Sequence, residues 1–227
     1  FPEICKESSR RKRLVQSVMN LCSKQSIQGV DLDYSPRSAP EFENYLLFLE
    51  EAIPQWHQAG IKVSMTLHPR QRLPPNLYQK LNRIHLMAYD MISPGNHHAS
   101  LSKTEEAIDF LLNASGSLDK ISYKILLGIP AYARHVKDPS KVRTFAEIYT
   151  DAVEEGKHTN IDWFNLNSWK GYEWDSPARI QEKIALARAK GLGGIFFWEI
   201  GQDKCTDNHP GGILLETAGG VSNHSDY

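Results

Sequence analysis

The sequence predicts an α/β protein in which a parallel sheet is covered by helices. Five short runs rich in β-branched and aliphatic residues alternate with segments whose apolar residues have helical spacing. The runs are apolar on both faces, which is typical of strands buried inside a parallel sheet. This pattern fits an open doubly wound sheet and a closed barrel equally well, and composition alone does not choose between them.

The strand candidates extend along most of the chain and leave one long gap. We expect adjacent parallel strands at residues 27–34, 61–67, 84–90, 124–129 and 194–199. The gap before the last candidate is longer than one crossover needs, so residues from about 133 to 172 are expected to form a small insertion. The last residues, 219–227, are expected to be a loose tail.

Capping residues mark several helix starts between these strands. Ser102 with Glu105, and Thr144 with Glu147, have the spacing of a capping box. Pro177 suits the first position of a helix. The segments with helical spacing of apolar residues are Leu14 to Cys22, Phe42 to Leu49, Ala107 to Leu112 and Ile180 to Ala187.

Composition excludes several classes of protein. The chain has 227 residues, 41% of them hydrophobic, which is enough for one sizeable core. Its formal net charge of -1 gives no overall attraction to nucleic acid or to an anionic membrane. No apolar stretch approaches the roughly 18 residues that span a bilayer. The cysteines, Cys5, Cys22 and Cys205, have no close pair, so they exclude the usual thiol metal site and allow at most one disulfide.

The first strand candidate carries two acids. Side chains alternate along a strand, so Val30 and Leu32 point to one side while Asp31, Asp33 and Ser35 share the other. The acids then face a barrel interior or the crevice at the strand ends, where such folds bind ligands. Two carboxylates about 7 Å apart repel each other, which should raise the pKa of one. A structural salt bridge is the alternative.

Two further strand candidates end in residues that suit a sugar ring. Tyr89 and Asp90 end the run MAYD, and Trp198 ends the run FFW. An indole face, a tyrosine hydroxyl and carboxylates from separate strand ends can stack on a sugar and bind its hydroxyls. We therefore expect Asp31, Asp33, Tyr89 and Trp198 to meet at the carboxyl ends of the strands.

Taken together, these stretches resemble glycoside hydrolase family 18. GVDLDYS resembles the family's strand-four signature D-G-x-D-x-D-x-E, MAYD its strand six, LLGIPAYAR its strand seven and GLGGIFFWEIGQD its strand eight. TFAEI resembles part of the family's small α+β insertion. The resemblance implies a (β/α)8 TIM barrel, of which this chain would hold only strands 4 to 8, with their helices and a small insertion between strands 7 and 8.

The resemblance also implies a ligand and roles for particular residues. The family acts on chitin, chito-oligosaccharides or the N-acetylglucosamine core of glycans, and the substrate's own acetamide attacks the anomeric carbon. Asp33 matches the aspartate that orients this acetamide, with Asp31 behind it. Tyr89 and Asp90 match the pair that holds the acetamide, and Trp198 matches the floor of the subsite where the bond breaks. No metal and no cofactor are expected.

The signature departs from the family pattern at two positions. Its last residue, the glutamate that protonates the leaving oxygen, is Ser35 here, and its first, usually aspartate, is Gln28. A serine hydroxyl is too weak an acid for this step, and a positioned general acid contributes roughly 10² to 10⁴ in rate. We therefore expect hydrolysis to be weak or absent while binding survives. Tyr34, inside the signature, is a further candidate for substrate binding.

Two other functions stay open on the same residues. An active family 18 glycosidase could take its acid from Glu41 or Glu43, although both fall in the helix expected after the signature. Glu199 is expected to point away from the pocket, because its neighbour Trp198 points inward. A protein-binding inhibitor or storage module on the same fold is the second alternative.

A metal site is the remaining interpretation of the paired acids. Asp31 and Asp33 would need further ligands, and His97 and His98 are candidates. These histidines follow a Pro-Gly pair and are expected in a surface loop, which argues against that site.

The ends of the chain bear on completeness and location. Phe1 is not an initiator methionine, and the family carries strands one to three before the signature, so we expect the C-terminal part of a barrel. Asn113-Ala-Ser115 and Asn223-His-Ser225 fit the N-glycosylation pattern and favour a secreted protein or one of the endomembrane lumen. The expected partner is an N-acetylglucosamine-containing glycan, and the oligomeric state is left open.

Overall fold

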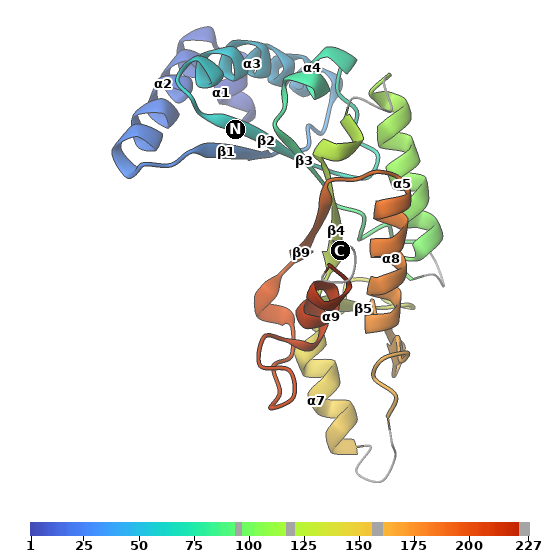
Figure 1. The fold of residues 1–227 in the computed structure, drawn as a ribbon. Coiled ribbons are helices and arrows are strands. Elements are labelled where there is room, and N and C mark those ends of the chain that lie inside the picture. The colour runs from blue at the N-terminus through green and yellow to red at the C-terminus, as the bar shows by residue number, and fades with distance from the viewer. Residues whose placement is uncertain (94–96, 117–120, 156–160, 223–227) are drawn as a thin grey trace.

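The main sheet of the protein consists of five parallel strands. The computed structural model describes residues 1–93, 97–116, 121–155 and 161–222. The strand order is β1-β2-β3-β4-β9, so the five predicted adjacent parallel strands are confirmed. In Figure 1 the strand direction turns progressively from β1 to β9, and the sheet curves like part of a barrel wall. The strands are β1 (Gly29–Asp33), β2 (Lys62–Leu67), β3 (Arg83–Leu86), β4 (Ile125–Pro130) and β9 (Gly194–Trp198).

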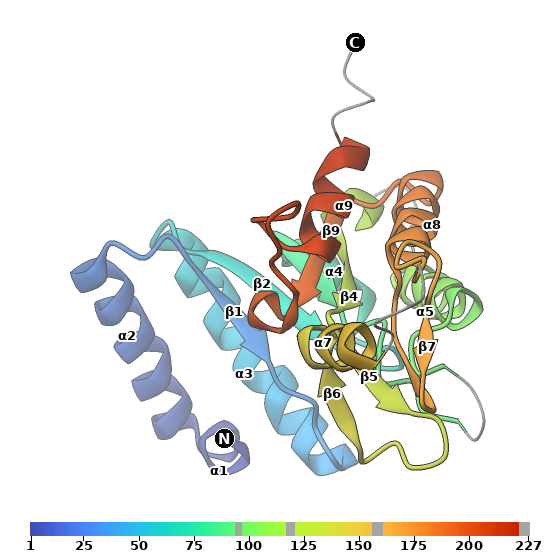
Figure 2. The same ribbon diagram turned by 90° about the horizontal axis from the view of Figure 1, so that it is seen from below.

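Helices cover the outer, convex face of this sheet. In Figure 2 the two long N-terminal helices, α2 and α3, lie beside the β1 end of the sheet, and α5 and α8 lie side by side at the β4 and β9 end. The connections between successive strands therefore run through helices, as parallel pairing requires. The helices are α1 (Pro2–Lys6), α2 (Ser8–Gln25), α3 (Ala39–Gln58), α4 (Pro75–Lys80), α5 (Leu101–Ala114) and α8 (Pro177–Ala189).

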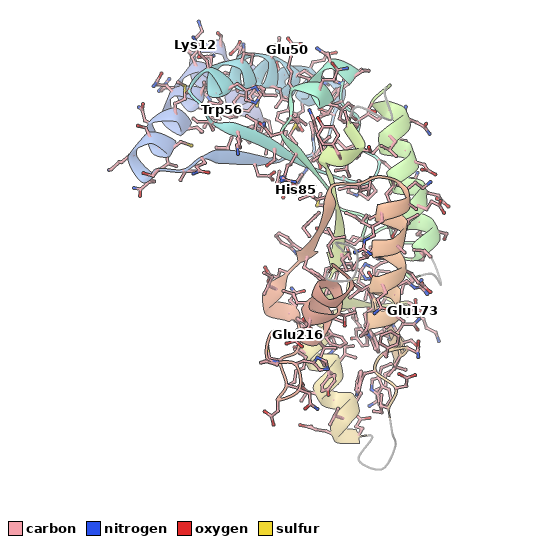
Figure 3. The ribbon with its side chains drawn as sticks, in the orientation of Figure 1. Lys12, Glu50, Trp56, His85, Glu173 and Glu216 are labelled. Atoms are coloured by element: carbon pink, nitrogen blue, oxygen red, sulfur yellow. The ribbon has the colours of Figure 1, made fainter. Side chains whose placement is uncertain are left out.

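The largest core lies between these helices and the sheet. Tyr45, Phe48 and Trp56 on α3 are almost fully buried, and so are Val63 and Met65 of β2. Figure 3 shows Trp56 between α3 and the strands. Because these large side chains fill the convex side, the polar residues of the same strands are left on the concave side.

A second, antiparallel sheet forms between β4 and β9 in the sequence, where we expected an insertion. Its order is β6-β5-β8-β7, and it is accompanied by α7. The predicted capping box at the start of α7 is confirmed: Thr144 Oγ1 accepts from the Glu147 N–H, and Glu147 Oε2 accepts from the Thr144 N–H. The elements are β5 (Tyr132–His135), β6 (Val142–Thr144), α7 (Phe145–Glu155), β7 (Ser168–Trp169) and β8 (Tyr172–Glu173).

Two local expectations differ from the structure. The predicted capping box at Ser102 is wrong, because α5 begins two residues earlier and Ser100 caps it by accepting from the Lys103 N–H. The expected tail is partly helical, since α9 (Ile213–Ser222) extends into it and Asp203 caps its start. The rest of that tail, with the triplet at 223–225, lies outside the described residues.

Other sequence features have simple structural counterparts. Asn113, in the last turn of α5, is exposed. The three cysteines are free; Cys5 and Cys22 are buried and Cys205 is exposed. Within the described ranges, no helix combines the length and the apolar character that crossing a membrane requires.

Gly128 of β4 is tightly packed on the concave side of the sheet. A Cβ at this position would lie 2.7 Å from Cζ of Phe196 and 2.8 Å from both Cε1 of Tyr89 and the Leu86 carbonyl oxygen. Gly128→Ala should therefore lower the free energy of unfolding by roughly 1–3 kcal/mol, as overpacking does. Urea denaturation measures it. Gly219→Ala, in open space on α9, is the matched control and should change stability by less than about 1 kcal/mol.

Candidate functional site

Asp31 joins the first three strands through its carboxylate. It accepts hydrogen bonds from the hydroxyls of Ser64 and Thr66 on β2, and its Oδ1 lies 3.0 Å from Nδ1 of His85 on β3. Figure 3 shows His85 on the concave side of the sheet, away from the covering helices. The parallel register places Asp31 beside Ser64 and Asp33 beside Thr66, so alternate residues of both strands share this face.

The pKa values of the two acids of β1 are shifted in opposite directions. Burial by itself would raise the pKa of Asp31, but the hydrogen bonds from His85, Ser64 and Thr66 outweigh it and hold the pKa below its usual value. Burial raises the pKa of Asp33, and the neighbouring Asp31 carboxylate raises it further. The prediction that one of the pair has a raised pKa is confirmed. Asp31 therefore stays ionised at a pH where Asp33 still holds a proton.

Asp90 is held by three residues, two from β5 and one from the loop before α5. Its Oδ1 accepts from the Tyr132 hydroxyl at 2.8 Å, and the Arg134 guanidinium binds both carboxylate oxygens, with Nη2 2.7 Å from Oδ2. Burial opposes ionisation, but bonds from His98, Arg134 and Tyr132 keep the Asp90 pKa well below its ordinary value. Asp90 has a left-handed backbone with φ of 56°, a conformation that aspartate tolerates better than most residues.

The adjacent histidines are not in the surface position that we expected. His98 is 3% exposed, and its ring stacks between those of His97 and Tyr132, with centroids 5.2 Å away on each side. The loop folds inward because the Met91 N–H donates to the His98 carbonyl and His98 Nδ1 lies 3.2 Å from the Asp90 backbone nitrogen. Burial lowers the pKa of His97 to about 4.

Of the two histidines, His98 contacts Asp90. His98 Nδ1 is 3.2 Å from Oδ1 of Asp90, whereas Asp31 is engaged with His85. In the part of the chain that the structure describes, no three histidine, cysteine or acidic side chains are placed to hold a metal.

Tyr89 and Trp198 occupy different positions relative to the acids. Tyr89 is 6% exposed and packs edge-on against Tyr132 and Phe196 inside the curve of the sheet. Burial raises its pKa, and the charges of Asp90 and Asp33 add to the shift, so these groups lie within electrostatic range. Trp198 is 50% exposed at the end of β9, the other edge of the sheet from β1. Among the described residues, no hydrogen bond or ring contact joins Trp198 to Asp33 or Tyr89.

Tyr34 does not join this group. Its ring packs edge-on against Phe1 and Tyr45, at centroid distances of 4.8 and 5.1 Å, on the side covered by helices. Its hydroxyl donates to Glu41 on α3 at 3.1 Å. Strand alternation places Tyr34 on the same side as Leu32, which explains why this predicted substrate-binding residue faces the core.

Ser35 makes one defined side-chain contact. Its hydroxyl donates to Oε1 of Gln71, which follows β2, at 3.0 Å. The same Oε1 accepts from the His68 N–H, and Nε2 of Gln71 donates to the Tyr34 carbonyl at 3.0 Å. One glutamine side chain therefore fastens the loop after β1 to the loop after β2.

Two hollows lie beside the loops that follow β1, β2 and β3. The first, of about 460 Å³, is lined by residues of the loops after β1 and β2, including Ser35. The second, of about 600 Å³, shares His68 and Arg70 with the first and extends between the β2 and β3 loops and α5 as far as Asp90. We call this edge of the molecule, formed by the loops after β1, β2 and β3, the rim.

Sequence reasoning missed the residues that position the acids. Ser64, Thr66 and His85 are polar residues at concave positions of otherwise apolar strands, a signal that alternation contains. Arg134 and Gln71 come from distant segments, and only the fold brings them to Asp90 and Ser35.

Comparison with known proteins identifies the family. The model of the glycosyl hydrolases family 18 matches residues 1–203. The chain belongs to glycosyl hydrolases family 18. Chitinase 1 of Aphanocladium album is 21% identical over 285 residues, covering 100% of this chain and 65% of that protein. A class V chitinase of Medicago truncatula is 24% identical, covering 90% of this chain and 66% of that protein. The chain thus spans about two thirds of these family 18 relatives.

Solved structures agree on the fold. A chitinase from Bacteroides thetaiotaomicron aligns with a TM-score of 0.84 and 17% identity over 100% of this chain and 74% of that one. A mutant class V chitinase from Nicotiana tobaccum, in complex with NAG4, aligns with a TM-score of 0.75 and 21% identity over 96% of this chain and 76% of that one. The five strands are therefore a partial family 18 barrel.

The pKa of Asp33 tests the coupling between the paired acids. Asp31→Asn removes the neighbouring negative charge, so the Asp33 pKa should fall, although burial keeps it from falling further. Carboxyl carbon chemical shifts followed by NMR during a pH titration measure the change. Ser64→Ala is the control, because it removes a hydrogen bond to Asp31 but keeps the charge. An unchanged Asp33 titration in Asp31→Asn would contradict the coupling.

Proposed function

We propose that the protein is a chitinase-like carbohydrate-binding protein that recognises N-acetylglucosamine polymers or oligomers and hydrolyses them weakly or not at all. The observation that carries the proposal is the residue at the acid position. Ser35 donates its hydroxyl hydrogen to Gln71, and a hydroxyl of this kind supplies no proton to a leaving oxygen near neutral pH.

The groups for binding support the other half of the proposal. Asp33 is a protonatable acid beside an ionised Asp31, the state suited to hydrogen-bonding an acetamide. Among the described residues, Arg134 is the one donor to Oδ2 of Asp90, and a carboxylate oxygen can accept a second hydrogen bond. Trp198 offers an exposed indole face. The Nicotiana tobaccum relative was solved with NAG4, a ligand of the proposed class.

Substitute acids receive little support. Glu41 accepts hydrogen bonds from the Tyr34 hydroxyl and from the Arg37 N–H, so its carboxylate is directed toward the loop and not toward Asp33. Glu43 is exposed on α3, and Glu199 is exposed beyond β9. We infer that an active glycosidase is the weaker alternative, and that a protein-binding role would leave the raised pKa of Asp33 without a function. The same proposal includes secretion or residence in the endomembrane lumen.

Trp198 provides a first test of glycan binding. In the full-length protein, Trp198→Ala should weaken binding of an N-acetylglucosamine oligomer by about 1 kcal/mol or more, because stacking on the indole is lost. Glu199→Ala, an exposed neighbour, is the matched control and should have little effect. Isothermal titration calorimetry gives both values. Equal losses would mean that the indole does not contact the sugar.

Ser35 provides the test of catalysis. Ser35→Glu in the full-length protein should create measurable hydrolysis of chito-oligosaccharides, and adding Asp33→Asn should abolish that gain. The rate should stay low, because the new carboxyl would face Gln71 and share its hollow with several cationic side chains, which favour its ionised form.

Release of reducing ends, measured for the parent and both variants, decides the question. If the parent already cleaves the substrate and Ser35→Glu does not change the rate, the proposal is wrong and another residue supplies the acid.

A further inference from the structure

The hollow beside Ser35 has an entirely basic set of charged side chains. It lies between the loops after β1 and β2, has a volume of about 460 Å³, and is lined in part by Arg37, Arg70 and Arg72, with His68. No acidic residue is among the described residues that line it. The second hollow differs in this respect, because Asp90 and Glu106 contribute to its lining.

The three arginines have no ionic partners in the described part of the chain. All three are exposed, and none of them forms a salt bridge with another described residue. The Arg72 guanidinium lies over the Phe110 ring, 4.2 Å from its centroid, a contact that leaves the N–H groups at its edge free. Glu41, the acid on the nearby helix, is turned toward the Tyr34 hydroxyl and the Arg37 N–H.

The hollow is also held in shape. Gln71 binds Ser35, His68 and the Tyr34 carbonyl, so the two loops that carry the arginines are tied to each other. Like charges gathered on connected loops repel, and an anion relieves that repulsion. Guanidinium forks match the oxygen geometry of carboxylates and sulfates, and charge-assisted bonds of this kind are about twice as strong as neutral ones.

The position of the hollow relates it to the glycan site. It shares His68 and Arg70 with the hollow that reaches Asp90. A sugar chain lying along the strand ends would therefore pass over the arginines on its way to Asp90. A neutral N-acetylglucosamine chain offers only hydroxyls and amides there, which leaves three cations without a counter-charge.

We propose that this basic hollow is an anion subsite that binds a sulfate or carboxylate carried by a sugar of the bound glycan. The preferred ligand is then an acidic glycan containing N-acetylated sugars. This inference rests on the proposed glycan binding for the neighbouring sugar. It assigns Arg37, Arg70 and Arg72 to ligand selection and gives Ser35 a role in maintaining the subsite.

Calorimetry with matched oligosaccharides tests the subsite in the full-length protein. The probes are N-acetylglucosamine tetramer, the same tetramer with 6-O-sulfates, and an oligomer in which N-acetylglucosamine alternates with glucuronate. At low salt the sulfated tetramer should bind about tenfold more tightly than the neutral one, and the difference should shrink as salt is added. The glucuronate oligomer shows whether carboxylates serve as well as sulfates.

Variants of single arginines locate the effect. Arg70→Gln should reduce the preference for the sulfated tetramer to about threefold or less, because Arg70 lines both hollows. Arg13→Gln removes the same charge from the exposed face of α2 and should leave the preference unchanged. Thermal unfolding of both variants, expected to match the parent, excludes misfolding as the cause.

The outcomes separate this inference from the proposed function. Equal affinity for sulfated and neutral tetramers overturns the anion subsite and leaves chitin-type binding intact. Binding of acidic oligomers alone supports the subsite and overturns recognition of neutral chitin. Binding of neither overturns both. An equal loss of preference in Arg13→Gln and Arg70→Gln overturns the subsite, because it assigns the effect to overall charge.

Discussion

The candidate site depends on one ionised carboxylate, that of Asp31. It accepts hydrogen bonds from side chains of β2 and β3 and thereby links three strands on their concave face. Its charge also acts on Asp33, which lies two residues further along the same strand and has a raised pKa. The Asp31 carboxylate thus links three strands and also adds to the rise in the Asp33 pKa, of which burial is the larger cause. If the donors on β2 and β3 were lost, burial would raise the Asp31 pKa, and the two acids would no longer differ in the direction of their shifts.

The fold was largely predictable because it depends on periodicity. Runs that are apolar on both faces and separated by amphipathic helices allow few arrangements other than a parallel α/β sheet, and five of the strands were located to within a few residues. The concave acids followed from the same alternation. That rule also placed Tyr34 on the helix side, yet its place inside the signature led us to include it with the ligand-binding residues. Local geometry was the better guide there.

The parts that could not be predicted are contacts between distant loops. The burial of His98 depends on a loop that turns inward to meet Asp90, and a Pro-Gly pair in sequence gives no indication of that turn. The Gln71 bridge to Ser35 joins residues that are 36 positions apart. Such contacts require the parallel register, which brings the ends of β1 and β2 together, and no local pattern encodes them. The charges along the rim, basic near Ser35 and mixed near Asp90, likewise come from loops that only the fold brings together.

The clamp on Asp90 has a consequence for how this fold can be divided. Tyr132 and Arg134 belong to β5, the strand that opens the antiparallel sheet, but their side chains reach back to an aspartate that follows β3 of the barrel. The smaller sheet is therefore not a detachable module. A chimera that exchanged it for a foreign insertion, or a minimal barrel that omitted it, would leave the half-buried Asp90 carboxylate without its Arg134 counter-ion. The two sheets have to be inherited, or engineered, as one unit.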